Sequence, residues 1–133
     1  MESSALVAAL LEHDTTAMLP VPAGTRLVTS ALTSAETTRA IVRARIAERL
    51  TTEQEREAVR ALRTFMRRCF VFDVDSHVLS RVGRRFPVEP VRTLDAVHLA
   101  TIELLEESPQ LVTVVTRDAR VRGNAQAMGY TVA

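Results

Sequence analysis

Four acidic residues have positions in the sequence that suit a metal-dependent reaction: Glu2, Glu36, Asp95 and Asp118. Each comes at the start of a predicted helix, Glu36 and Asp118 directly after a predicted strand and Glu2 where a first strand would end. Ligands of open α/β sheets bind at such places, beyond the carboxyl ends of the strands. Carboxylates packed together repel one another, and some take up protons unless a cation holds them. Because the ligands are hard oxygens with no cluster of histidines or thiolates, the predicted ion is Mg²⁺ or Mn²⁺. Such an ion clamps a phosphodiester and activates water, so nuclease chemistry is the first expectation, ahead of phosphatase chemistry.

Each acid also has a purely structural interpretation, which stays open at this point. Acids are common in the first turn of a helix, where they cap free amides and interact favourably with the helix dipole. Glu36 has the spacing of a capping box with Thr33, and Asp118 has the position of an N-cap. His98 comes one helical turn after Asp95, but we interpret it as a buried core residue.

The elements that must position these acids alternate between strand and helix. Helices are predicted over residues 3–12, from a capping box at Thr33, from a second box formed by Thr52 and Glu55, after Asp75, from Thr93 to about Glu107, and over residues 118–128. Strands are predicted over residues 26–31, 69–74, 111–115 and from Tyr130. This alternation predicts a single α/β domain, a sandwich with a parallel sheet, over residues 1–133.

Composition restricts the class of protein further. With 133 residues and a formal net charge of +1, the chain can bury a core, and its totals predict no strong polyanion-binding field. The single cysteine, Cys69, excludes an internal disulfide and favours the reducing cytoplasm. The apolar segment 5–11 is too short for a membrane span. Arg39 and Arg92 lie three residues from Glu36 and Asp95 and could pair with these acids or meet substrate phosphate. Of the two roles we predict structural ion pairs for both.

Four segments carry a resemblance to a known family. Residues 2–7 (ESSALV) resemble the opening of PIN domains of the VapC toxin type. Residues 33–40 (TSAETTRA) are similar to the second family motif, and residues 92–100 (RTLDAVHLA) closely match the third and most specific one. Residues 115–118 (VTRD) look like the fourth motif. The motifs follow the family's order and spacing, and the resemblance covers the whole chain.

The resemblance implies a three-layer α/β/α sandwich with a central, mostly parallel sheet, and RNA cleavage that depends on Mg²⁺ or Mn²⁺. It implies that Glu2, Glu36, Asp95 and Asp118 hold the metal and activate water, while Thr116 and Ser4 (or Ser3) support the site by hydrogen bonding. It also implies a cognate antitoxin as partner and a homodimer.

Two departures from the family pattern lead to an alternative. The first acid is Glu2 where the family has aspartate, and only Met1 precedes it where the family has a short strand. We therefore expect the first strand to be very short or missing, unless the true start lies upstream. The alternative is a PIN-fold protein that binds RNA or an antitoxin with weak or no nuclease activity. Another Mg²⁺-dependent phosphoryl-transfer enzyme is a weaker hypothesis, because the sequence has no glycine-rich phosphate loop.

Overall fold

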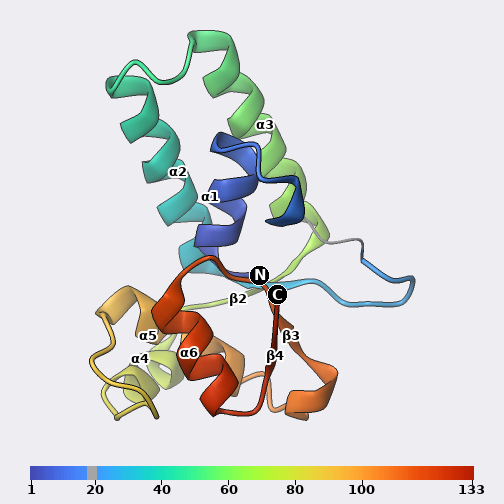
Figure 1. Cartoon of the computed structure of the whole chain (residues 1–133), viewed down its shortest axis with the longest axis vertical. Coiled ribbons are helices and arrows are strands. Elements are labelled where there is room, and N and C mark those ends of the chain that lie inside the picture. The colour runs from blue at the N-terminus through green and yellow to red at the C-terminus, as the bar shows by residue number, and fades with distance from the viewer. Residues whose placement is uncertain (18–20) are drawn as a thin grey trace.

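The computed structural model describes residues 1–17 and 21–133. These residues form helices and very short strands (Figure 1). The helices are α1 (Ser3–Leu11), α2 (Ala31–Ile46), α3 (Thr52–Arg68), α4 (Ser76–Val82), α5 (Thr93–Glu103) and α6 (Ala119–Ala127). The strands are β1 (Val28–Ser30), β2 (Phe70–Phe72), β3 (Thr113–Val114) and β4 (Thr131–Val132). Single 3₁₀ turns, η1 (Thr15–Ala17) and η2 (Pro109–Leu111), lie in the connections. The predicted α/β class with parallel strands is confirmed.

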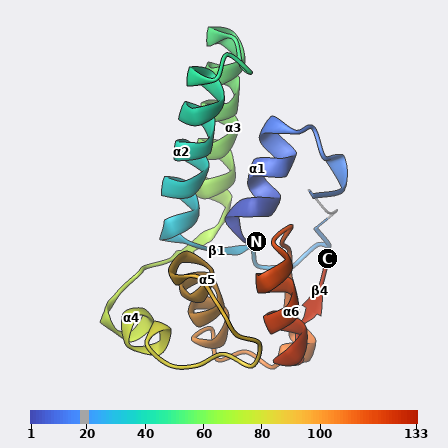
Figure 2. The same cartoon turned by 60° about the vertical axis from the view of Figure 1, so that its left-hand side comes forward.

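Helices α1, α2 and α3 pack against one another on one side of the strands (Figures 1 and 2). Helix α3 is strongly amphipathic: Ala58, Leu62 and Phe65 are buried along one stripe. Leu6 of α1 and Ile41 of α2 are buried against that stripe and complete a first hydrophobic core. Helix α3 therefore packs on α1 and α2 through a single apolar stripe.

Helices α4, α5 and α6 form a second group on the other side of the strands (Figure 2). Helix α5 is the central member, because residues 96–101 are all buried. Leu99 of α5, Val78 of α4 and Val121 of α6 meet in a second hydrophobic core, which is larger than the first. A helix that is apolar on most faces is expected to be buried in this way. Within the described part of the chain, no helix is both long and apolar enough to cross a membrane.

The strands form two separate parallel pairs rather than one continuous sheet. Strand β1 pairs with β2 and β3 pairs with β4. Met1 and Glu2 lie between the pairs: the Met1 amine donates to the Val28 carbonyl at 2.8 Å, and the Glu2 N–H donates to the Val115 carbonyl at 2.9 Å. A groove of about 660 Å³ adjoins this Met1–Glu2 bridge, lined by residues 24–30, residues 111–115 and α5. The bridge places Glu2 at the junction of the two halves of the molecule.

The start of α2 differs from the sequence-based prediction. Ser30 is the N-cap, with its hydroxyl accepting the Leu32 N–H at 3.2 Å, so the helix begins earlier than Thr33. Thr33 is fully buried, and its hydroxyl accepts a hydrogen bond from Thr29 at 3.0 Å. The predicted capping box of Thr33 and Glu36 is therefore wrong, and Glu36 lies in the second turn of the helix.

Two other helix ends and one strand also differ from the prediction. The capping box of α3 is formed by Thr51 and Gln54, one residue before the predicted pair. Helix α5 ends at Glu103, short of the predicted Glu107. Leu111 belongs to η2 and is 79% exposed, so the predicted buried strand is reduced to Thr113–Val114.

Candidate functional site

Glu2 is the N-cap of α1, and protein donors surround its carboxylate. The residue is only 7% exposed. Its carboxylate accepts hydrogen bonds from the Ser3 hydroxyl at 2.6 Å, the Ser4 N–H at 3.0 Å and the Thr116 hydroxyl at 2.7 Å, and from the Ser4 hydroxyl. Burial by itself would raise the pKa of Glu2, but His98 and these hydroxyls outweigh burial and lower that pKa. Glu2 is therefore held in its ionised form by its neighbours.

Glu36 lies across from Glu2, and His98 joins the two. Oε2 of Glu36 is 2.6 Å from Nε2 of His98 and 2.7 Å from the Ser3 hydroxyl. Burial would raise the pKa of Glu36, but the hydrogen bond with His98 and the one with Ser3 lower it overall. His98 is 4% exposed, and its Nε2 is also 3.6 Å from Oε1 of Glu2. His98 is buried as predicted, but it contacts two acids instead of filling an apolar core.

Asp95 has the opposite environment. It lies in the first turn of α5, as predicted, and its Oδ2 is buried without a hydrogen-bond partner among the described residues. Burial raises the pKa of Asp95, and the negative charge of Asp118 raises it further, while Arg120 and Arg92 partly offset both. Asp95 therefore carries an unsatisfied oxygen close to a second acid.

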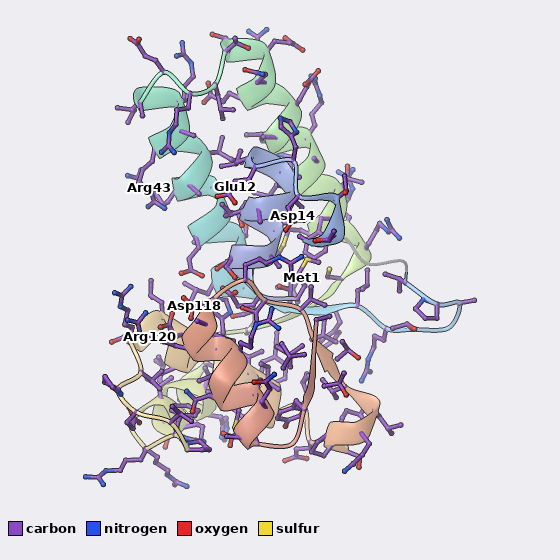
Figure 3. All side chains as sticks on the ribbon, viewed as in Figure 1. Met1, Glu12, Asp14, Arg43, Asp118 and Arg120 are labelled. Atoms are coloured by element: carbon purple, nitrogen blue, oxygen red, sulfur yellow. The ribbon has the colours of Figure 1, made fainter. Side chains whose placement is uncertain are left out.

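Asp118 is fixed by its role as the N-cap of α6. Its Oδ1 accepts the N–H groups of Arg120 at 2.7 Å and Val121 at 3.1 Å, so the structural interpretation of this acid is confirmed. Its own N–H donates to the hydroxyls of Ser4 at 3.0 Å and Thr116 at 3.1 Å. Figure 3 shows Asp118 at the end of α6 that is nearest α1 and α2.

Ser4 and Thr116 connect the two sides of the site. The Ser4 hydroxyl donates to Glu2 and accepts the N–H groups of Arg117 at 2.8 Å and Asp118 at 3.0 Å. Thr116 is fully buried and donates to the same Glu2 carboxylate. The two hydroxyls thus hold the start of α1 against the turn between β3 and α6.

Arg117 fastens the segment after α1 to the same turn. Its Nε donates to Oδ2 of Asp14 at 2.9 Å, and its Nη2 donates to the Thr16 hydroxyl at 2.9 Å. Hydrogen bonds from Thr16 and Arg117 lower the pKa of Asp14 to about 2. In Figure 3, Asp14 lies above Met1, on the same side of the molecule as the β3–α6 turn. The turn that carries Asp118 is therefore anchored at two points.

A family model for the PIN domain matches residues 1–125. The chain belongs to the PIN-domain family. Ribonuclease VapC35 of Mycobacterium tuberculosis is 33% identical over 107 residues, which make up 80% of this chain and 71% of that protein. Ribonuclease VapC46 of the same species is 34% identical over 105 residues, or 79% of this chain and 71% of that protein. No solved structure gives a significant match. The resemblance to VapC-type PIN proteins is thus confirmed.

The four predicted acids do not form one uniform cluster in this PIN domain. Glu2, Glu36 and His98 each offer a ligand atom, and these atoms all lie within 4.8 Å of one another. Asp95 lies outside this group of three, and the negative charges of Asp118 and Glu2 act on it to raise its pKa. Sequence reasoning did not assign His98 to the site. The available signal was its spacing from Asp95, one turn along a buried helix.

The arginines beside the acids also differ from the prediction. Among residues 1–17 and 21–133, neither Arg39 nor Arg92 is within 4.0 Å of a carboxylate oxygen, so the predicted ion pairs with Glu36 and Asp95 are wrong. Arg92 and Arg120 are exposed near Asp95, where their charges lower its pKa. Their guanidinium groups remain available for a negatively charged ligand.

Proposed function

We propose that this PIN domain is an endoribonuclease that depends on Mg²⁺ or Mn²⁺, and the toxin of a type II toxin–antitoxin pair. The names of its relatives, both ribonucleases, support the reaction. The observation that carries the metal requirement is Asp95: its buried Oδ2 has no hydrogen-bond partner among residues 1–17 and 21–133, and its neighbour Asp118 has the same charge. A cation shared by the two carboxylates would remove both penalties.

In this proposal Asp95 and Asp118 hold the ion, and Glu2 and Glu36 complete the acidic site from the side of α1 and α2. When bound, the ion would polarise the phosphodiester of the RNA and lower the pKa of a bound water. The protein keeps the acids in place: the hydroxyls of Ser4 and Thr116 bind Glu2 and the backbone of Asp118. Arg92 and Arg120 provide positive charge for the phosphates of the RNA.

The direct test is RNA cleavage by the purified protein with Mg²⁺ or Mn²⁺ and with the variant Asp95→Asn. Removing a metal ligand is expected to reduce the cleavage rate by about 100-fold or more, since even residues that only support a ligand account for about 10- to 100-fold. Asp73→Asn is the matched control, because Asp73 is an exposed aspartate outside the site. Undiminished cleavage by Asp95→Asn would refute the proposed site.

A second candidate function is binding of RNA or an antitoxin with weak or no cleavage. It is favoured by Glu2, whose carboxylate is already occupied by the Ser3, Ser4 and Thr116 donors. Glu2→Asp shortens the side chain by one methylene and gives the acid that the family has at this position. If this function is the true one, Glu2→Asp gains cleavage while the unmodified chain binds RNA without hydrolysing it. Equal cleavage by both proteins supports the nuclease instead.

We further propose that the fold is completed as a three-layer α/β/α sandwich, and that the partners are RNA, a cognate antitoxin and a second copy of the chain, all in the cytoplasm. A homodimer is supported by Leu79 of α4 and Leu94 of α5, which are 56% and 48% exposed on helices that pack together. Light scattering after size-exclusion chromatography tests the dimer, and Leu79→Glu should shift it to monomer.

A further inference from the structure

We infer that Glu2, Glu36 and His98 form a mixed nitrogen–oxygen site for a divalent transition-metal ion, such as Zn²⁺ or Co²⁺, which binds there more tightly than Mg²⁺. The inference rests on the proposed function and deepens it, because it adds a second metal position with a nitrogen ligand on the Glu2–Glu36 side of the acidic site, beside the one formed by Asp95 and Asp118. It concerns His98, which neither the sequence-based prediction nor the relatives' names assign to metal binding.

The first argument is convergence. Glu2 caps α1, Glu36 lies on α2 and His98 lies on α5, so three separate elements direct one ligand atom each to the same point. All three atoms lie within 4.8 Å of one another. Glu2 and His98 are buried at 7% and 4% exposure, whereas the Glu36 side chain is 24% exposed. Glu2 and His98 are thus shielded from water, whereas the more exposed Glu36 side chain has room to change its position.

The second argument comes from counting protons and charges. The Ser3 hydroxyl lies 2.6 Å from Glu2 and 2.7 Å from Glu36, but it has a single proton and can donate to only one of them at a time. Nε2 of His98 is 2.6 Å from Oε2 of Glu36, and as a donor it likewise has one N–H to give to one acid. A protonated imidazole leaves the cluster with one negative charge. A divalent ion with a neutral imidazole balances both carboxylates.

The third argument is size. In a tetrahedral site with ligand bonds of about 2.1 Å, neighbouring ligand atoms are about 3.4 Å apart. Nε2 of His98 and Oε1 of Glu2 are already 3.6 Å apart. The distance from Nε2 to Oε2 of Glu36 is 2.6 Å, so Glu36 must move outward by about 0.8 Å. Since Glu36 is the most exposed of the three, this movement requires no change in the buried core.

The nitrogen ligand decides which ion is preferred. Imidazole suits Zn²⁺, Co²⁺ and related ions, whereas Mg²⁺ takes oxygen ligands and keeps much of its water. A buried site with one nitrogen and two carboxylates therefore discriminates against Mg²⁺. The pair formed by Asp95 and Asp118 offers only oxygens, which suit Mg²⁺ or Mn²⁺.

The experiment is titration of the purified full chain with Co²⁺, followed by its visible absorption, and competition by Zn²⁺ and then by Mg²⁺. The wild type should give a Co²⁺ spectrum that Zn²⁺ removes and that Mg²⁺ leaves intact. His98→Gln should weaken Zn²⁺ binding at least tenfold. His77→Gln, which changes an exposed histidine on α4, should bind as the wild type does. Circular dichroism of each variant checks that it is folded.

Glu36→Gln provides a second variant at a partly exposed position, in case His98→Gln fails to fold; it should also weaken Zn²⁺ binding at least tenfold. Unchanged Zn²⁺ affinity in a folded His98→Gln or Glu36→Gln protein would overturn the inference and leave His98 and Glu36 as a structural ion pair. Loss of binding in His77→Gln would overturn it in favour of a surface site. The readout needs no RNA, so a failed nuclease assay with intact Zn²⁺ binding refutes the proposed function alone. Asp95→Asn should keep the Co²⁺ spectrum.

Discussion

The two halves of the acidic site, Glu2 with Glu36 and Asp95 with Asp118, both offer carboxylates, but Glu2 and Asp95 have opposite environments. Glu2 and Glu36 are surrounded by hydroxyls and an imidazole, and their pKa values are lowered although burial acts to raise them. The buried Oδ2 of Asp95 has no hydrogen-bond partner in the described part of the chain, and burial and the charge of Asp118 raise the pKa of Asp95. The difference shows that an acid's position at a strand–helix corner does not fix its charge state. The surrounding donors do.

The largest expected effect on stability comes from neutralising the well-bonded half. Glu2→Gln replaces a buried carboxylate that accepts four hydrogen bonds with an amide whose NH₂ group faces donors. Leaving buried donors unsatisfied should lower the free energy of unfolding by about 3 kcal/mol. Urea unfolding measures this change, with Glu12→Gln at the exposed end of α1 as the matched control. A loss no greater than that of the control would mean that the two halves are energetically alike.

A smaller effect of opposite sign is expected for the unsatisfied half. Asp95→Asn removes a charge that burial and Asp118 both disfavour, so the protein should become more stable. Because the side chain is only partly buried, solvent screening limits the gain to about 0.5 kcal/mol. The same urea experiment in metal-free buffer measures it. Destabilisation by Asp95→Asn would show that its carboxylate has a stabilising contact after all.

The smallest expected effect is the pH dependence of the two changes in unfolding free energy, the loss in Glu2→Gln and the gain in Asp95→Asn. The lowered pKa values of Glu2 and Glu36 stabilise the fold above the ordinary glutamate pKa, and this contribution is lost as the pH falls through the folded-state values. The raised pKa of Asp95 acts the other way: its penalty develops as the pH rises above the ordinary aspartate pKa and is complete above the raised folded-state pKa. The loss in Glu2→Gln and the gain in Asp95→Asn should therefore both shrink towards low pH. A difference that stayed the same as the pH fell through the acid range would have a cause other than ionisation.

Much of the fold could be predicted from residue patterns. The stripe of Ala58, Leu62 and Phe65 and the buried run of α5 follow from helical periodicity, which local sequence records directly. The start of α2 could not be predicted, because Ser30 and Thr33 are both acceptable caps. The choice is made by tertiary packing, which buries Thr33 against Thr29.

The candidate site was predicted in part for the same reason. Asp95 and Asp118 were placed correctly, since first-turn and N-cap positions depend on neighbouring residues. The contact between His98 and Glu36 could not be predicted, because the two residues lie on different helices and are 62 positions apart in the chain. A histidine in an apolar helix gives no sign of what packs opposite it. Which acids have donors and which do not is likewise a property of the assembled fold.

The Met1–Glu2 bridge also bears on folding cooperativity. The two larger hydrophobic cores of the described residues lie between α1–α3 and around α5. Glu2 and Ser4 hydrogen-bond to the turn that belongs to the second of them. The residues that hold the acids therefore also transmit stability from one core to the other. Weakening them would let each core open on its own, and amide exchange would then report two unfolding units in place of one.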